Sequence, residues 1–209
     1  MLLVGIDPSK AATGFAVVQW RGLTDRPLLR LCRCIEDGTL AEVSAATDAA
    51  WAKVYDIAQA EGLSLHVAAE VNFAGPGAQA HDAILLRLGM VLAGAWSAGL
   101  DLGGVVQLRK GGPAPGPADV SVWVTAQWGK QLGVARSKQG SGAGKGLHRI
   151  VEAERIVDCG AALRSVDHAV DRAEAVLLAA AEAYRRVGVV LPDTVESKAK
   201  TPKRRTKAA

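Results

Sequence analysis

The sequence contains few cysteines and no segment typical of export or membrane insertion. Its three cysteines, an odd number among 209 residues, predict a protein of a reducing compartment. The apolar N-terminal run ends at Asp7, which is too early for a signal peptide. The longest apolar stretch, residues 83–100, contains Arg87 and many small residues, so we interpret it as a buried helix rather than a membrane span.

The cysteines do not predict a zinc site. Cys32 and Cys34 lie two residues apart on a predicted strand and therefore share one face. No spacing in the chain fits the usual pattern of zinc ligands. We interpret Cys32 and Cys34 as small core residues.

The chain also lacks the motifs of a nucleotide-binding enzyme. A phosphate-binding GxxxxGK[ST] loop would need Gly at 139 and Ser or Thr at 146, where the sequence has Gln139 and Gly146. Sugar kinases and actin-like ATPases begin with a similar Gly-Ile-Asp hairpin, but they need a second such domain, for which 209 residues leave no room. We therefore expect no nucleotide cofactor.

Positive charge is concentrated in the last residues. The formal net charge is +4, and residues 196–209 hold six Lys or Arg against Glu196, which leaves −1 for the rest of the chain. Such a run predicts a disordered tail that binds polyanions weakly. We expect one domain over residues 1–190 and a disordered basic tail over 191–209, without internal repeats.

Short apolar runs alternate with longer helical patterns, which predicts an α/β fold. We expect strands over 2–6, 14–20, 28–35, 65–71 and 104–108, and helices over 45–61, 78–98, 119–132, 147–157 and 169–187. This order is that of an RNase H-like domain. The predicted sheet is mixed and five-stranded, with three antiparallel strands followed by parallel ones, and helices cover both faces.

Two acidic residues end predicted buried strands. Asp7 directly follows the apolar run 2–6, and Glu70 ends the apolar run that begins at residue 65. If the two strands are neighbours, both carboxylates reach the sheet edge where sites form in open α/β sheets. A buried charge is costly unless something pairs with it. Asp7 could instead cap the turn before Pro8, and Glu70 could pair with a lysine.

A third acidic group lies near the C-terminus. Asp167, Asp171 and Glu174 are spaced i, i+4, i+7 and share one face of a predicted helix. The segment after Glu174 is apolar, so these acids lie at the entry of a buried helix, where the helix dipole favours negative charge. They could also be ordinary charges of a helix N-terminus.

Three acidic points at one place would repel one another strongly, and divalent cations would remove that penalty. Carboxylate oxygens with open water positions suit Mg²⁺, or Mn²⁺ in its place. Two such ions can clamp a phosphodiester, one activating water and the other stabilising the leaving oxygen. The combination of acids predicts two-metal hydrolysis of phosphodiesters.

Three segments resemble, in order, the motifs of RuvC-type Holliday-junction resolvases. GIDPSKAATGFAVV is similar to the first motif, HVAAEVNF followed by a long small-residue helix to the second, and HAVDRAEAVLLA to the last. The similarity is greatest to the phage and prophage branch, with its Arg-Ala-Glu-Ala version of the last motif. It spans about residues 2–186. The sequence departs from the pattern at Ser9, where many relatives have Gly, and in a longer Pro-rich loop at 109–118.

The resemblance implies a homodimeric, Mg²⁺-dependent endonuclease that nicks four-way junctions or other branched DNA. It would act in the cytoplasm of a bacterial cell and could be phage-encoded. Carried over by position, the catalytic residues and metal ligands are Asp7, Glu70, Asp171 and Glu174. Some relatives have a histidine three residues before the last acid. If the last motif is aligned in that register, His168 and Asp171 form this pair and His168 is also a metal ligand. The helix over 78–98 is the expected dimer surface.

DNA contacts are expected from basic and aromatic side chains. The candidates are Phe73, Lys138, Lys145, His148 and Arg149. The four basic residues lie on or beside a glycine-rich loop and would contact phosphates. Phe73 follows Glu70 closely and could wedge against a base, or it could pack beneath its own loop. The basic tail would add salt-sensitive, non-specific affinity.

Two other functions are compatible with the sequence. A non-catalytic DNA-binding protein of the same fold would have a relic active site, yet all four acids are present. A ribonuclease of the same fold shares the phosphodiester chemistry, and the preference for one sugar depends on contacts that a sequence does not reveal.

Overall fold

The structure is a computed structural model. It describes residues 1–9, 12–71, 78–100, 105–107, 120–134, 143–164 and 166–192. Most of the predicted basic tail, residues 193–209, lies outside these ranges. The strands are β1 Leu2–Pro8, β2 Ala12–Gln19, β3 Leu28–Glu36, β4 Leu65–Glu70, β5 Val105–Gln107 and β6 Val120–Trp123. The helices are α1 Leu40–Glu61, α2 Ala78–Ser97, α3 Thr125–Gln131, α4 Ala143–Ile156 and α5 Ala169–Arg186.

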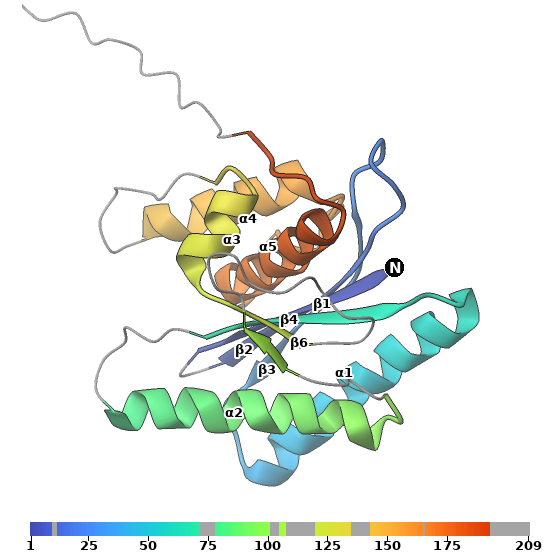
Figure 1. The fold of residues 1–209 in the computed structure, drawn as a ribbon. Coiled ribbons are helices and arrows are strands. Elements are labelled where there is room, and N and C mark those ends of the chain that lie inside the picture. The colour runs from blue at the N-terminus through green and yellow to red at the C-terminus, as the bar shows by residue number, and fades with distance from the viewer. Residues whose placement is uncertain are drawn as a thin grey trace, which may run out of the picture.

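The strands form one mixed sheet in the order β3-β2-β1-β4-β6-β5. The first three strands pair antiparallel, and β1–β4, β4–β6 and β5–β6 pair parallel. Helices α1 and α2 lie on one face of the sheet and α3, α4 and α5 on the other (Figure 1). The predicted RNase H-like α/β fold is therefore confirmed, with a sixth strand in addition to the five expected.

The additional strand replaces the first part of a predicted helix. Residues 120–123 form β6, and the helix that follows, α3, covers only Thr125–Gln131 of the predicted 119–132. The short sequence Val-Ser-Val-Trp has the β-branched and aromatic residues that strands favour, and it is inserted between β4 and β5 with parallel partners on both sides. Tertiary pairing decided the structure of this segment.

Two helices begin earlier than predicted. Helix α1 starts at Leu40 rather than Ala45, because Thr39 and Glu42 form a reciprocal capping box. Helix α4 starts at Ala143, within the segment that we expected to be a loop. The apolar stretch 83–100 is mostly helix α2, which packs on the sheet through Leu88, Val91 and Ala95. No helix in the described part of the chain is long and apolar enough to cross a membrane.

A hydrophobic core lies on each face of the sheet, and strand β1 contributes to both because its side chains alternate between the two faces. Leu2, Val4 and Ile6 pack toward α1 and α2, whereas Leu3 packs toward α5. Asp7 continues the alternation on the α5 face, in register with Leu3. The central strand therefore carries an acidic side chain toward α5 at its C-terminal end.

Helix α5 lies directly on the sheet because two glycines leave room for its backbone. A Cβ atom on Gly5 would collide with the carbonyl oxygen of Ala175, and one on Gly14 would collide with that of Asp171. The helix is rich in alanine along this contact, and its residues from Ala175 to Ala181 are fully buried. The close approach fixes the position of the first turns of α5 over β1 and β2.

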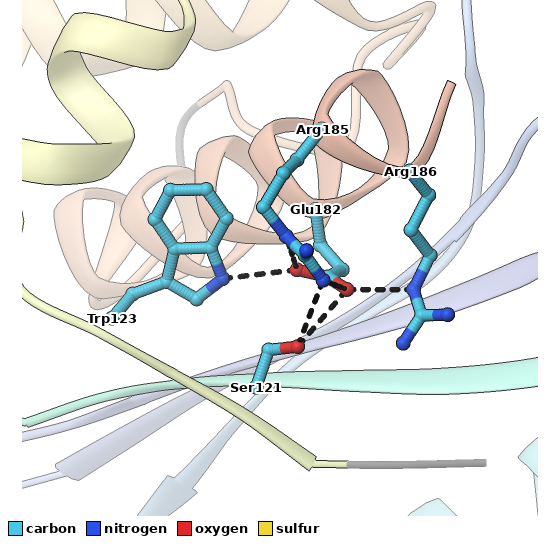
Figure 2. A network of polar contacts seen from close by, with 5 residues as sticks. All are labelled: Ser121, Trp123, Glu182, Arg185 and Arg186. Atoms are coloured by element: carbon cyan, nitrogen blue, oxygen red, sulfur yellow. Dashed lines mark hydrogen bonds and ion pairs between the residues drawn. The ribbon is translucent and has the colours of Figure 1, made fainter. Parts of the chain in front are cut away.

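The last turns of α5 are held by a buried carboxylate (Figure 2). Glu182 is fully buried and accepts hydrogen bonds from the Ser121 hydroxyl at 3.0 Å and the Trp123 indole N–H at 3.1 Å. The guanidinium groups of Arg185 and Arg186 also donate to it, from Nε at 2.9 and 2.6 Å. The network joins α5 to β6, at the opposite end of the helix from Asp171, and a buried charge with this many partners is satisfied.

Substitution of Gly5 tests the packing of α5. We expect Gly5→Ala to lower the free energy of unfolding by about 3 kcal/mol or more, because the added methyl group meets helix backbone that must move. Gly89→Ala on α2 is the matched control, because its methyl group would have no neighbour within 4 Å. The control should leave stability unchanged or raise it by up to about 1 kcal/mol. Chemical denaturation measures both, and equal stabilities for the two variants would contradict the close packing.

Candidate active site

Asp7 and Glu70 lie side by side at the carboxyl ends of two central strands. Ile6 pairs with Ala69 in the parallel ladder of β1 and β4, so the next residue of each strand reaches the same edge of the sheet. Both side chains point to the face that α5 covers, as their alternation with Leu3 and Ala68 requires. Asp7 is 7% exposed and Glu70 is 6% exposed. The predicted juxtaposition of these two carboxylates is present in the fold.

The first turns of α5 add two more carboxylates. Asp171 and Glu174 are one turn apart, and their side chains are 25% and 21% exposed. Asp167, which we expected on the same helix face, precedes α5 and is exposed. The predicted acidic face of the helix therefore consists of two residues.

The electrostatics of Asp7 show that the four carboxylates form one cluster. Burial raises the pKa of Asp7 well above its ordinary value of 3.8, and the charges of Glu70, Glu174 and Asp171 raise that pKa further. A hydrogen bond with Glu174 adds to the effect, since it is made by the protonated form of the Asp7 carboxyl. In the absence of a cation, the cluster therefore opposes the ionisation of Asp7.

Two residues that sequence reasoning did not place at this site hold the acids in position. The indole N–H of Trp128 on α3 donates a hydrogen bond of 2.6 Å to Glu70, and Trp128 is fully buried. The guanidinium carbon of Arg149 on α4 lies 4.6 Å from the centre of the Trp128 ring, and Arg149 Nε is 3.1 Å from Glu174 Oε1. Trp128 and Arg149 thus connect Glu70 with Glu174. No local signal predicts a contact between residues 58 positions apart in sequence.

His168 lies at the rim of the acidic cluster. It precedes α5 with a left-handed backbone, φ 54° and ψ 34°, and its Nδ1 is 3.3 Å from Asp171 Oδ2. Cys34 on β3 is half-buried beside this pair, although we had interpreted it as a core residue. Cys32, two residues earlier, packs against the core.

The predicted DNA contacts are only partly within the described structure. Phe73, Lys138 and the side chain of Lys145 lie outside it. His148 is half-buried on α4, and its Nε2 is buried without a hydrogen-bond partner among the described residues. Arg149 is 6% exposed and faces the acids rather than the surface.

The donor set of the cluster fits a hard divalent cation. Asp7, Glu70, Asp171 and Glu174 present only carboxylate oxygens, which are the ligands that Mg²⁺ and Mn²⁺ prefer. Burial and the three neighbouring acids both raise the pKa of Asp7, and a cation would offset both effects. A bound cation would allow all four groups to ionise together.

Comparison with solved structures shows a fold shared with RuvC. The Thermus thermophilus RuvC structure matches with a TM-score of 0.58 at 19% sequence identity, covering 92% of this chain and 99% of that chain. T. thermophilus RuvC in complex with Holliday junction substrate matches with a TM-score of 0.57, at the same identity and coverage. No protein-family model and no curated protein matches the chain. The similarity to RuvC that the sequence motifs indicated is therefore confirmed for the fold.

Neutralising Asp7 tests the electrostatic account of the cluster. Folding raises the pKa of Asp7, so the folded state favours the protonated carboxyl. The stability that this protonation provides is fully present below about pH 4, and it is lost as the pH rises through the folded-state pKa. In EDTA at pH 7.5, we therefore expect Asp7→Asn to be more stable than the wild type by about 1 kcal/mol or more, since one pKa unit corresponds to about 1.4 kcal/mol. The difference should vanish near pH 4.

Thermal unfolding at the two pH values measures this effect. Asp48→Asn, an exposed position on α1, is the matched control and should change little at either pH. An Asp7→Asn protein that is less stable than the wild type at pH 7.5 would show that the carboxylates do not repel one another.

Proposed function

We propose that the protein is a metal-dependent endonuclease that cleaves phosphodiester bonds in branched DNA, with the four-way junction as its main substrate. The observation that carries the proposal is the convergence of four carboxylates at the edge of the sheet, where burial and the charges of the other three acids raise the pKa of Asp7. The fold shared with a RuvC that was solved with a Holliday junction supports the choice of substrate. The sequence motifs support it independently, because their acids are the ones that converge.

The residues of the cluster would hold two Mg²⁺ ions, which Mn²⁺ can replace. When bound, such ions supply an activated water and stabilise the leaving oxygen of a phosphodiester. Asp7 is hydrogen-bonded to Glu174 of α5 and feels the charges of Glu70 on β4 and Asp171 on α5, and we assign to it the role of a shared ligand. Asp7 would bind such an ion as the ionised carboxylate, and the ion would offset the burial and repulsion that raise its pKa.

Trp128 and Arg149 are positioning residues in this account. The Trp128 indole donates a hydrogen bond to one oxygen of Glu70 and so restricts the orientation of this carboxylate. Arg149 places a positive charge beside Glu174, where a phosphate group of the substrate would arrive. Its burial favours this role over the phosphate contact at the protein surface that we expected from the sequence.

A homodimer would supply the two active sites that symmetric cleavage of a junction requires. Helix α2 supports this arrangement, because it presents apolar side chains on its outer face. Leu86 is 69% exposed and Trp96 is 72% exposed. We retain α2 as the proposed surface for a second copy of the chain.

Cleavage assays with isosteric variants test the proposed function. In Mg²⁺, we expect the wild type to make paired nicks in a synthetic four-way junction and to leave a linear duplex of the same sequence intact. Asp7→Asn and Glu70→Gln should each reduce the rate by a factor of about 10³ or more, because they remove charge from the metal ligands. Both should still bind the junction. Asp48→Asn is the control and should cleave like the wild type.

Several outcomes would contradict parts of this proposal. An active Asp7→Asn enzyme would exclude the carboxylate site, and cleavage that continues in EDTA would exclude the metal. Tight junction binding without any cleavage by the wild type would indicate a non-catalytic binding protein. Cleavage of an RNA–DNA hybrid in place of the junction would indicate a ribonuclease.

A further inference from the structure

Beside the four carboxylates, the structure brings together a thiol, an imidazole and a carboxylate. The ligand atoms of Cys34, His168 and Asp171 all lie within 4.8 Å of one another. None of the three is fully buried, so the group is accessible from solvent. Two of its three members, Cys34 and His168, are outside the proposed catalytic set.

The fold brings these residues together from two segments of the chain, strand β3 and the start of helix α5. Cys34 on β3 is paired with Gly14 on β2, and Gly14 is the position over which the backbone of Asp171 lies. His168 adopts a left-handed conformation immediately before α5, which is unusual for a residue other than glycine. In this conformation its Nδ1 lies 3.3 Å from the Asp171 carboxylate. The strained backbone at residue 168 keeps the imidazole at the rim of the site.

The chemistry of this group differs from that of the neighbouring cluster. A thiolate and an imidazole are ligands of Zn²⁺ and of similar transition metals, whereas Mg²⁺ avoids sulfur. Ligand bonds of about 2.0–2.3 Å in a tetrahedron put the ligand atoms about 3.5 Å apart. The pair of His168 and Asp171 already meets this spacing. The thiol of Cys34 lies within 4.8 Å of both ligand atoms, so only a small approach would complete the tetrahedron. Three protein ligands leave one coordination position open, as in zinc sites that are not purely structural.

We propose that Cys34, His168 and Asp171 form a binding site for a thiophilic divalent cation of the Zn²⁺ class. Coordination forms a bond between Cys34 Sγ and the metal, and the proton of the thiol is released to solvent. Because Asp171 is a ligand in both sites, occupation of this site withdraws one carboxylate from the hard-cation cluster. The consequence, inhibition of cleavage by Zn²⁺, rests on the proposed function, but the binding itself does not.

Cobalt absorption spectroscopy on the full-length protein tests the site without any DNA. Co²⁺ added to the metal-free wild type should give a thiolate-to-cobalt charge-transfer band in the near ultraviolet, and an equimolar amount of Zn²⁺ should remove the band. Cys34→Ser should abolish it. Cys32→Ser is the matched control, because Cys32 lies on the same strand and face but is not part of the ligand group. Its thiol instead lies 3.9 Å from the backbone carbonyl oxygen of Arg172, to which it donates a hydrogen bond. This control should retain the band.

The absence of a band in the wild type, or an equal band in Cys34→Ser, would overturn the proposal. An equal loss of the band in Cys32→Ser would also overturn it, because the thiol would then not be specific to this site.

A second measurement connects the site to catalysis. At constant Mg²⁺, each variant's cleavage with added Zn²⁺ is divided by its own cleavage without it, so that differences in basal rate cancel. We expect Cys34→Ser to need at least about tenfold more Zn²⁺ for half-inhibition than Cys32→Ser, because it has lost a metal ligand. If the cobalt band is present but the wild type cleaves no nucleic acid, the site stands and the proposed function fails. If the wild type cleaves the junction but the cobalt band is absent, the proposed function stands and the proposed thiolate site fails.

Discussion

The close contact between the backbone of α5 and the sheet is the constraint on which the candidate site depends. Gly5 and Gly14 have no Cβ atoms, so the helix can rest on β1 and β2 with its carbonyl groups against the strands. The contact places Asp171 and Glu174 above the strand ends that carry Asp7 and Glu70. A helix held one side chain further away could not bring four carboxylates into one electrostatic cluster.

The rest of the fold offsets the repulsion that this arrangement creates. The cluster destabilises the metal-free protein, since burial and three neighbouring acids oppose the ionisation of Asp7. At the other end of α5, Glu182 is satisfied by hydrogen bonds from α5 and β6, and the alanine-rich middle of the helix is fully buried. Stability is therefore concentrated away from the site, and the site keeps the charge that its chemistry needs.

The sequence predicted the parts of the structure that follow from local patterns. The apolar runs that end at Asp7 and Glu70 gave both the strands and their acids, and the alanine-rich pattern after residue 169 gave α5. Long-range contacts were not predictable in this way. Strand β6 is defined by its pairing between β4 and β5, and Trp128 reaches Glu70 only because α3 is folded back over the sheet. Arg149 was predicted as a DNA contact because its charge was visible in the sequence, whereas its burial against Trp128 was not.

The central claim is that Asp7, Glu70, Asp171 and Glu174 together form a site for hard divalent cations. Anomalous X-ray diffraction from crystals soaked in Mn²⁺ tests it most directly, because the signal locates the metal without reference to activity. We expect anomalous density enclosed by these four carboxylates in the wild type and its loss or strong reduction in Asp7→Asn. Well-diffracting crystals at saturating Mn²⁺ with no density at this point, or with density only at exposed acids elsewhere, would contradict it.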